Sequence, residues 1–305
     1  MSSSAQRRIQ GGLVIRILIT GANSYIGTSF AAYLAQPEFS GMYQVDTLDM
    51  IGEAWKTFDF SLYDTVYHVA GIAHSDNGKI SEERAKLYYA VNTDLTVACA
   101  KRAKEAGVKQ FIFMSSAIVY GDSAPIGKSK IITRDTPVNP ANCYGDSKVQ
   151  AENGIRSLDC DTFKVVILRP PMIFGKGSKG NYPLLSKLAQ KLPVFPKIEN
   201  CRSMLYIGNL VEFVRLTIEN GERGTFWPQN PQYSNTSDII AAIAKAHGKR
   251  CVLIPGFGWA LKILAHVTGL VNKAFGNLAY DQSMSEYKLP YQKYCLQEAI
   301  ERTEG

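Results

Sequence analysis

The feature that most constrains this chain is an apolar run that leads directly into a glycine turn near its start. Residues Leu13 to Thr20 are β-branched and almost continuously apolar, as in a strand buried on both faces of a parallel sheet. The turn Gly21-Ala22-Asn23-Ser24-Tyr25-Ile26-Gly27 follows, and residues 28–36 are compatible with a helix. A strand, a glycine turn and a helix in this order are typical of a dinucleotide-binding unit.

The residues of this turn suit a pyrophosphate. Gly21 allows a tight turn, and Gly27 lets the helix lie close to the strand. Ser24 stands where the usual pattern has a middle glycine, and its small side chain still permits close approach. Glycine turns occur in many folds, but the flanking strand and helix favour a cofactor site here. We therefore predict that the cofactor contacts Gly21, Ser24, Tyr25, Ile26 and Gly27.

An acidic residue is expected at the end of the second strand of such a unit. It accepts hydrogen bonds from the adenosine ribose and repels a 2′-phosphate. Residues 43–49 read as this strand, and Asp49 at its end is the preferred candidate, with Asp46 as the alternative. No arginine follows Asp49 directly, which favours NAD over NADP.

Further segments alternate between strand and helix patterns. Strands are predicted over 65–71, 109–114 and 163–168, and helices over 81–106 and 144–157. This alternation predicts an α/β fold with a Rossmann-type doubly wound parallel sheet. The 305 residues leave room for a second, smaller domain.

A candidate proton-transfer group follows the strand predicted over 109–114. Tyr144 and Lys148 are four residues apart, so they lie one above the other on a helix. The strand over 109–114 delivers Ser115 and Ser116 at its carboxyl end, where ligands of such sheets bind. The alternative is an ordinary helical pair. His68 also lies at a strand end, but we expect it to pack rather than to catalyse.

Six motifs occur in an order that resembles the extended short-chain dehydrogenase/reductases, and more narrowly their nucleotide-sugar epimerase/dehydratase branch. The resemblance covers most of the chain. The motifs are TGANSYIG (Thr20 to Gly27), VAG (Val69 to Gly71), VNTD (Val91 to Asp94), SSAIVYG (Ser115 to Gly121), YGDSK (Tyr144 to Lys148) and LRPPMIFG (Leu168 to Gly175).

The resemblance implies three catalytic residues. Tyr144 is expected to move a proton to or from a sugar hydroxyl while a hydride moves on the attached carbon. Lys148 is expected to lower the pKa of Tyr144 and to hold the nicotinamide ribose. Ser116 is expected to bind the same oxygen, and NAD is the expected cofactor, with NADP less favoured.

The same resemblance implies the remaining ligand contacts. Arg202 is expected to bind the diphosphate of the substrate because a guanidinium offers a fork of charged donors. The alternative interpretation of Arg202 is a surface ion pair. Cofactor contacts are expected at Asp59, Phe60, Val69, Ala70, Gly71, Asn92 and Ser115, as well as at Tyr144 and Lys148. Substrate contacts are expected at Ser116, Ala117, Tyr120, Asn181 and Arg202.

Two departures from the family pattern narrow the reaction. Dehydratases carry an Asp-Glu pair where this chain has Ala117 and Ile118, so dehydration is disfavoured. Met172 replaces the asparagine that epimerases usually carry, and the Pro-Pro sequence before it resembles 4-ketoreductases that make deoxy-amino sugars. The predicted function is hydride transfer at carbon 4 of a UDP-hexose, as in a 4-epimerase. The alternatives are a one-way UDP-4-keto-sugar reductase of polysaccharide biosynthesis and, more remotely, a non-catalytic NAD(P)-binding regulator.

The resemblance also implies a division of the chain and a homodimer. Residues 13–180 are expected to form the cofactor domain, and residues 203–230 are expected to return to it. Residues 181–202 and 231–305 are expected to form a smaller substrate domain. In the C-terminal third of the chain, helices are predicted over 184–192, 209–219 and 237–247, and the last is expected to be capped by Thr236 or Ser237. The apolar segment 257–275 is expected to be a helix that packs on the small domain; a membrane-surface or partner-binding helix is the alternative.

Composition excludes several other classes of protein. The net charge of +7 is spread along the chain, which argues against nucleic-acid binding. The six cysteines show neither paired spacing nor histidine partners, so we expect reduced thiols and no metal. Residues 1–12 have no signal-peptide pattern, and no run reaches the roughly 18 apolar residues of a membrane span. We expect a cytoplasmic protein without firm membrane association.

Overall fold

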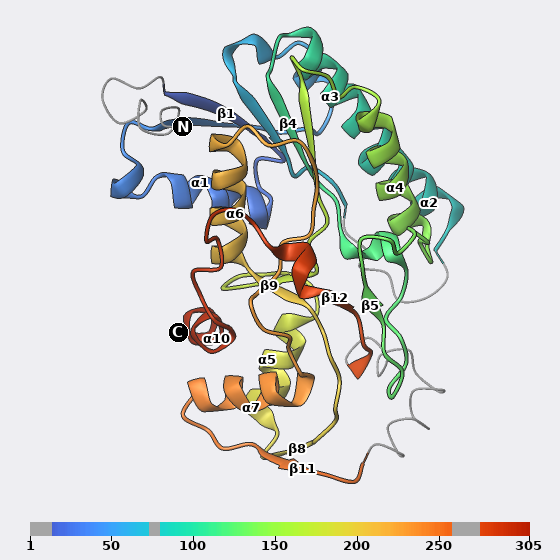
Figure 1. Cartoon of the computed structure of the whole chain (residues 1–305), viewed down its shortest axis with the longest axis vertical. Coiled ribbons are helices and arrows are strands. Elements are labelled where there is room, and N and C mark those ends of the chain that lie inside the picture. Colours follow the sequence, from blue (N-terminus) through green and yellow to red (C-terminus); the bar gives the residue numbers. More distant parts are fainter. Residues whose placement is uncertain (1–13, 73–79, 258–274) are drawn as a thin grey trace.

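The computed structural model describes residues 14–72, 80–257 and 275–305 of the 305-residue chain. A six-stranded parallel sheet forms the upper lobe in Figure 1, and a smaller group of helices and short strands lies below it. This architecture confirms the predicted doubly wound sheet. In spatial order the strands of the sheet are β2 (Tyr43–Leu48), β1 (Ile15–Thr20), β3 (Thr65–His68), β4 (Gln110–Met114), β6 (Lys164–Leu168) and β10 (Gly224–Phe226).

The strand order creates a switch point at the carboxyl end of β1. The chain passes from β1 to β2 on one side, and β3 then pairs with β1 on the other side. Thr20 and His68, the last residues of β1 and β3, are direct partners in this register. Ligands of open α/β sheets bind at such a point. The glycine turn after Thr20 therefore begins at the expected ligand-binding edge.

Helices cover both faces of the sheet because its strands are apolar on both sides. Ile17 and Ile19 of β1 pack towards α1 and α6, whereas Leu18 between them packs towards α3 and α4. The helices of this lobe are α1 (Tyr25–Leu34), α2 (Glu82–Tyr88), α3 (Leu95–Glu105), α4 (Cys143–Arg156) and α6 (Ile207–Glu219), and a π-helical turn (Tyr89–Asp94) joins α2 to α3.

A separate hydrophobic cluster holds the smaller group together. It includes Phe174, Leu185, Phe195, Ile240 and Ile300, all of which are buried. The contributing elements are β7 (Met172–Phe174), α5 (Tyr182–Lys191), β8 (Val194–Pro196), β9 (Met204–Tyr206), α7 (Thr236–Ala246), β11 (Val252–Ile254) and α10 (Leu296–Glu304).

The C-terminal segment departs from the expected division of the chain. Strand β12 (Ala279–Tyr280) pairs with β5 (Ile131–Ile132). Tyr291 packs in the hydrophobic cluster that α1 and α6 form against the sheet. Residues around 279–291, within the segment 231–305 that was expected to form the smaller domain, thus also contact the upper lobe. Aromatic side chains in this segment find their apolar partners on the sheet and on α6.

Several predicted boundaries also shift. Helix α1 begins at Tyr25, because the Ser24 hydroxyl caps it, rather than near residue 28. The side chain of Asn235, not that of Thr236 or Ser237, caps α7. The predicted helix over 81–106 is helical throughout but contains the π-helical turn. Most of the predicted apolar helix over 257–275 lies outside the described residues.

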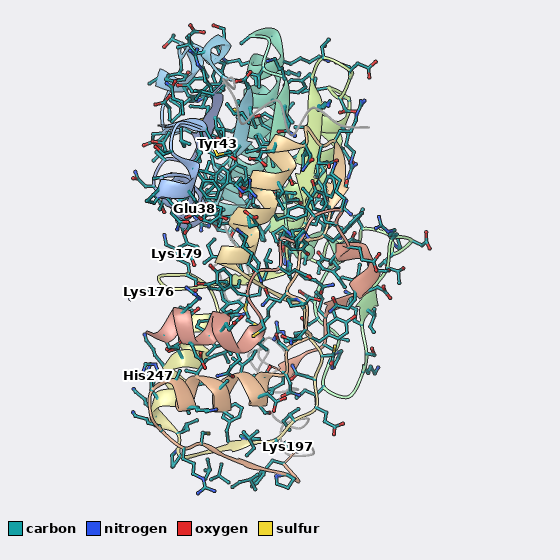
Figure 2. All side chains as sticks on the ribbon, turned by 60° about the vertical axis from the view of Figure 1, so that its left-hand side comes forward. Glu38, Tyr43, Lys176, Lys179, Lys197 and His247 are labelled. Carbon is teal, nitrogen blue, oxygen red and sulfur yellow. The ribbon has the colours of Figure 1, made fainter. Side chains whose placement is uncertain are left out.

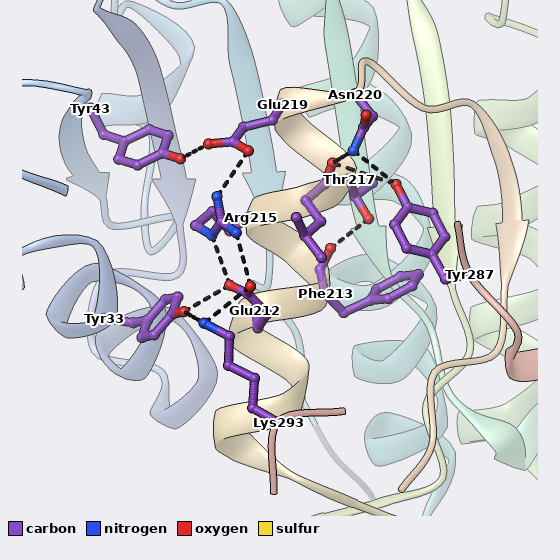
Figure 3. A network of polar contacts seen from close by, with 11 residues as sticks. Tyr33, Tyr43, Glu212, Phe213, Arg215, Thr217, Glu219, Asn220, Tyr287 and Lys293 are labelled. Atoms are coloured by element: carbon purple, nitrogen blue, oxygen red, sulfur yellow. Dashed lines mark hydrogen bonds and ion pairs between the residues drawn. The ribbon is translucent and has the colours of Figure 1, made fainter. Parts of the chain in front are cut away.

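Charged and phenolic side chains attach α6 to the first β-α-β unit (Figure 3). Glu212 is 3% exposed, and it accepts hydrogen bonds from Arg215 Nε at 2.7 Å and from Tyr33 Oη at 2.7 Å. Lys293 Nζ lies 3.1 Å from its other oxygen. Burial acts to raise the pKa of Glu212, but the bonds from Arg215 and Tyr33 hold it below its usual range.

This network predicts a large stability loss on truncation. Replacing Glu212 with Ala leaves the largely buried Arg215 without one of its carboxylate partners, so we expect the free energy of unfolding in urea to fall by about 3 kcal/mol at neutral pH. Because the folded-state pKa of Glu212 is lowered, the difference should shrink as the pH falls through that value. Glu105→Ala, at an exposed position of α3, is the control, and an equal loss there would contradict the prediction.

Candidate active site

The glycine turn lies directly against the end of β3. Gly21 has φ +93°, and a Cβ there would come 2.9 Å from the backbone N of Ala70. A Cβ on Gly27 would come 2.7 Å from Ser24 Oγ, and that oxygen accepts a hydrogen bond from Gly27 N at 3.1 Å. Both glycines are therefore required by close packing. The first backbone N–H groups of α1 are left at the sheet edge, where a phosphate binds well.

The two residues that complete the turn pack inward. Ile26 joins the cluster between α1 and the sheet. The hydroxyl of Tyr25 is buried, has no hydrogen-bond partner within the described residues, and lies beside Gly175, where a Cβ would come 2.5 Å from it. Burial raises the pKa of Tyr25 above its usual range. Backbone groups, rather than these side chains, are thus available to a pyrophosphate.

The acidic candidates at the second strand occupy different positions. Asp49 is exposed just beyond the end of β2, and one of its oxygens accepts from Ile51 N at 3.0 Å. Asp46 lies within β2 and accepts from Tyr63 Oη at 3.1 Å. Asp49 is therefore the better placed of the two for a ribose at the sheet edge.

Two of the residues expected to contact the cofactor, Asp59 and Phe60, are held by local contacts. Asp59 Oδ1 accepts from the N and Oγ of Ser61 at 2.9 and 2.6 Å, and these bonds lower the pKa of the carboxyl group. Phe60 is 1% exposed, and its ring lies 5.7 Å from the Arg102 guanidinium carbon. The ring of Phe60 belongs to the core, so only its backbone can face a ligand.

Ser116 and Tyr144 meet at the carboxyl end of β4. The side chains of the two residues are hydrogen-bonded. Burial raises the pKa of Tyr144 to about 12; the bond from Ser116 acts to lower it, and Tyr88, whose ring centre is 5.8 Å away, acts to raise it. The phenol is therefore protonated at neutral pH in this structure.

Lys148 lies under the same edge. Its side chain is buried, and Nζ donates to the backbone O of Met114 at 3.0 Å and stands 4.7 Å from the centre of the Phe113 ring. Burial lowers the pKa of Lys148 to about 8, opposed by the negative charge of Glu152. The expected lowering of the Tyr144 pKa by Lys148 does not appear here, because burial of the phenol dominates and the ammonium is bonded to Met114.

Asn92 connects the end of β3 to α4. Its Oδ1 accepts from Ile72 N at 2.9 Å, and its Nδ2 donates to Ile72 O at 3.1 Å and to Ser147 Oγ at 3.2 Å. A Cβ on Gly71 would lie 2.9 Å from Asn92 Oδ1 and 3.4 Å from Lys148 Nζ. Asn92 belongs to the π-helical turn, a local irregularity that often marks functional sites. The predicted cofactor residues 69–71 and Asn92 are thus brought next to Lys148.

His68 links the strands at the switch point. Its Nδ1 is 2.7 Å from Thr20 Oγ1, and its Nε2 is 3.0 Å from Thr96 Oγ1. Burial, reinforced by the charge of Lys148, lowers the pKa of His68 to about 3, so the ring stays neutral. This position agrees with the expectation that His68 packs rather than catalyses.

A buried ion pair below Lys148 was not predicted from the sequence. Glu152 is 1% exposed; its Oε1 accepts from Ser115 Oγ at 2.6 Å and from Arg169 Nε at 3.0 Å. Arg169 Nη1 in turn donates to Tyr120 Oη at 2.7 Å, and Trp227 Nε1 donates to the same oxygen at 2.8 Å. The only sequence signal was the position of Glu152, one helical turn after Lys148.

This network changes the assignment of two predicted contacts. The hydroxyl of Ser115 is bonded to Glu152, and Ser115 is 4% exposed. Tyr120 is likewise 4% exposed, and its hydroxyl already has two donors. We therefore propose that both side chains hold the neighbouring strands and helix in position and do not contact cofactor or substrate.

The predicted substrate residues are at different depths. Arg202 lies between strands of the lower part of the molecule: its backbone pairs with Ser234 and with Leu278, and burial lowers the pKa of its guanidinium. Ala117 is buried directly after Ser116. Asn181 is exposed at the start of α5 and does not cap that helix.

Residues 14–72, 80–257 and 275–305 lack two further features, a metal-binding cluster and a membrane-spanning helix. In these ranges no group of three or more His, Cys, Asp or Glu side chains is arranged to hold a metal ion. No helix in the same ranges is both long enough and apolar enough to cross a membrane.

The chain is similar to several known proteins. Residues 17–227 match the model of the NAD dependent epimerase/dehydratase family. The chain is 30% identical to UDP-glucose 4-epimerase from Vibrio cholerae, over 94% of both chains. Its fold resembles that of UDP-glucuronic acid 4-epimerase from Bacillus cereus, solved with UDP-glucuronic acid and NAD (TM-score 0.71, 20% identity, 95% and 98% coverage). It also resembles a dTDP-4-dehydrorhamnose reductase from Clostridium acetobutylicum (TM-score 0.70, 18% identity, 95% and 98% coverage).

The ion pair below Lys148 predicts how that lysine titrates. Glu152→Gln keeps the size of the side chain but removes the negative charge that favours the ammonium, so the pKa of Lys148 should fall further below about 8. NMR titration of protein labelled at the lysine side chains, with Lys148→Met to assign the signal, measures this value. Glu105→Gln should leave it unchanged. An unchanged or raised pKa in Glu152→Gln would show that the carboxylate does not act on Lys148.

Proposed function

Because the chain belongs to the NAD dependent epimerase/dehydratase family, we propose that it is a nucleotide-sugar 4-epimerase that moves a hydride at carbon 4 of a UDP-hexose. The observation that carries this proposal is the hydrogen bond between Ser116 and Tyr144 beside the buried Lys148, at the edge where the glycine turn begins. The nearly full-length similarity to a UDP-glucose 4-epimerase supports the choice of reaction.

The residues at this edge fit NAD. Gly21, Gly27 and Gly71 each lack the Cβ that would collide with a neighbour, so the turn and the segment after β3 pack closely, as in the glycine turns that hold a pyrophosphate. Asp49 supplies an exposed carboxylate for the adenosine ribose, and a carboxylate there disfavours the 2′-phosphate of NADP. When bound, NAD supplies a hydride acceptor and a positive charge. Lys148 would hold the ribose that carries the nicotinamide, and Asn92 would line the cofactor site beside Gly71.

Tyr144 supplies the proton transfer. Its phenolic oxygen takes the proton of the sugar hydroxyl as the carbon is oxidised and gives it back as the carbon is reduced. The pKa of about 12 means that the phenolate forms only where positive charge faces it, and Lys148 is mostly cationic below pH 8. Ser116 holds the phenolic oxygen in place throughout.

Dehydration is disfavoured by what surrounds Ser116. Elimination of water needs an additional acid and base, and the positions directly after Ser116 hold Ala117 and Ile118 in a short 3-10 helix. Neither side chain can move a proton.

The substrate is proposed to carry a diphosphate. Arg202 supports this class because a guanidinium offers a fork of charged donors that matches phosphate oxygens. Asn181 is a second, exposed candidate for the same ligand.

A one-way UDP-4-keto-sugar reductase is the second candidate. It is favoured by Met172, which lies in β7 against the hydrophobic cluster of the lower lobe instead of offering an amide to a sugar. A non-catalytic regulator is disfavoured because a chain without activity has no need to retain Ser116, Tyr144 and Lys148 together.

An activity assay separates the two reactions. The purified protein is incubated with a panel of UDP-hexoses and a catalytic amount of NAD, and products are separated by chromatography. Interconversion of 4-epimers without net change in absorbance of the reduced cofactor is the expected result. Consumption of one reduced cofactor for each 4-keto sugar, with no epimerisation, would replace the epimerase by the reductase.

Substitution of the tyrosine tests the proton transfer. Tyr144→Phe removes the phenolic oxygen, so kcat should fall by a factor of about 100 to 10,000 in whichever assay is positive. Tyr287→Phe is the matched control, because that hydroxyl bonds to Glu222 near α6, and it should keep full activity. Undiminished activity of Tyr144→Phe would rule out the proposed mechanism.

A further inference from the structure

The ribbon formed by β8 and β11 is apolar on both of its faces. In its parallel register Val194 pairs with Val252 and Pro196 with Ile254, so these side chains share one face. Phe195, on the other face, is buried in the cluster of the lower lobe. A strand with one buried face normally carries polar residues on the opposite one. Here the outward face is apolar, with Val194, Val252 and Ile254 exposed by 47%, 46% and 36%.

Two further exposed apolar residues lie close to the ribbon in the chain. Leu192, directly before β8, is 37% exposed, and Phe257, shortly after β11, is 47% exposed. We call the group Leu192, Val194, Val252, Ile254 and Phe257 the β8–β11 face. The ribbon lies at one end of the longest axis of the molecule, away from the parallel sheet (Figure 1). A contiguous exposed apolar group of this kind marks an interaction surface more often than a scattered set of single residues does.

Positive charge surrounds the β8–β11 face. Lys191 and Lys197 flank β8, Lys249 and Arg250 precede β11, and all four are exposed. Lys197 is seen at this end of the molecule in Figure 2. Glu199 is the only acidic residue in segments 191–199 and 245–257. In the sequence, moreover, no Asp or Glu occurs between Asp238 and Asp281. In these two segments basic residues therefore outnumber acidic ones, although the net charge of the chain as a whole is spread along its length.

We propose that the β8–β11 face docks the protein on the surface of an anionic lipid membrane. Apolar side chains with lysine and arginine around them are the combination that holds proteins at a membrane interface: the apolar groups enter the headgroup region, and the cations are attracted by acidic lipids. A second copy of the chain fits less well, because two such faces would bring their positive charges together. This proposal does not depend on the reaction proposed above.

Binding to vesicles tests the proposal. The full chain is sedimented with vesicles of equal parts phosphatidylcholine and phosphatidylglycerol, and with vesicles of phosphatidylcholine alone. We expect binding to the anionic vesicles only, and release as salt is raised. Equal binding to both vesicles, or binding to neither, would overturn the proposal. Light scattering after size exclusion measures self-association: a dimer that dissociates when Val194 and Val252 are replaced by Thr would identify the face as a contact between copies instead.

Two pairs of substitutions assign the binding to this face. Lys197→Gln with Arg250→Gln should lower the partition coefficient on anionic vesicles at least about tenfold, because each basic residue contributes to the attraction. Val194→Thr with Val252→Thr keeps the shape of the side chains and should lower it severalfold. The controls on the sheet lobe, Lys86→Gln with Lys101→Gln and the single variant Ile51→Thr, should bind like the unmodified chain. Wild-type binding in both pairs, or an equal loss in the controls, would show that the β8–β11 face is not the docking surface.

Discussion

The arrangement of the site depends on one buried ion pair. The carboxylate of Glu152 on α4 joins Ser115 at the end of β4 to Arg169 just after β6. An unpaired charge at this depth would be strongly destabilising, so the two strands and the helix are held in one relative position. Tyr144 and Lys148 lie on the same helix, two turns and one turn before Glu152, and this position aims them at the sheet edge.

Removal from water is the dominant electrostatic effect at that edge. It lowers the pKa of Lys148 to about 8 and that of His68 to about 3, and it raises that of Tyr144 to about 12. Each shift favours the uncharged form. A proton can therefore leave Tyr144 only when positive charge is supplied from nearby, and in the proposed function Lys148 and the nicotinamide ring would supply it. The neutral His68 meanwhile ties β1 to α3 without competing for that proton.

Local patterns predicted the parts of this molecule that depend on near neighbours in the chain. The strand before Gly21, the close packing at Gly27 and the spacing of Tyr144 and Lys148 all follow from residues within one or two turns. The patterns did not predict the hydrogen-bond partners of side chains whose partners lie far away in the sequence. Ser115 and Tyr120 were expected to contact ligands, and their hydroxyls bond to Glu152 and Arg169, which lie 37 and 49 residues away.

The sequence alone determined the order of strands, glycine turns and helices, because burial and backbone conformation impose periodicities that can be read directly. It also led us to propose Ser116, Tyr144 and Lys148 as the proton-transfer group, because proton transfer needs side chains of that chemistry. Tertiary structure alone decided which charges are removed from water and which partner each buried hydroxyl takes. It also decided that Val194 and Val252, 58 residues apart, form one apolar outward face. Burial and pairing depend on segments brought together from across the chain, and a linear pattern does not contain those distances.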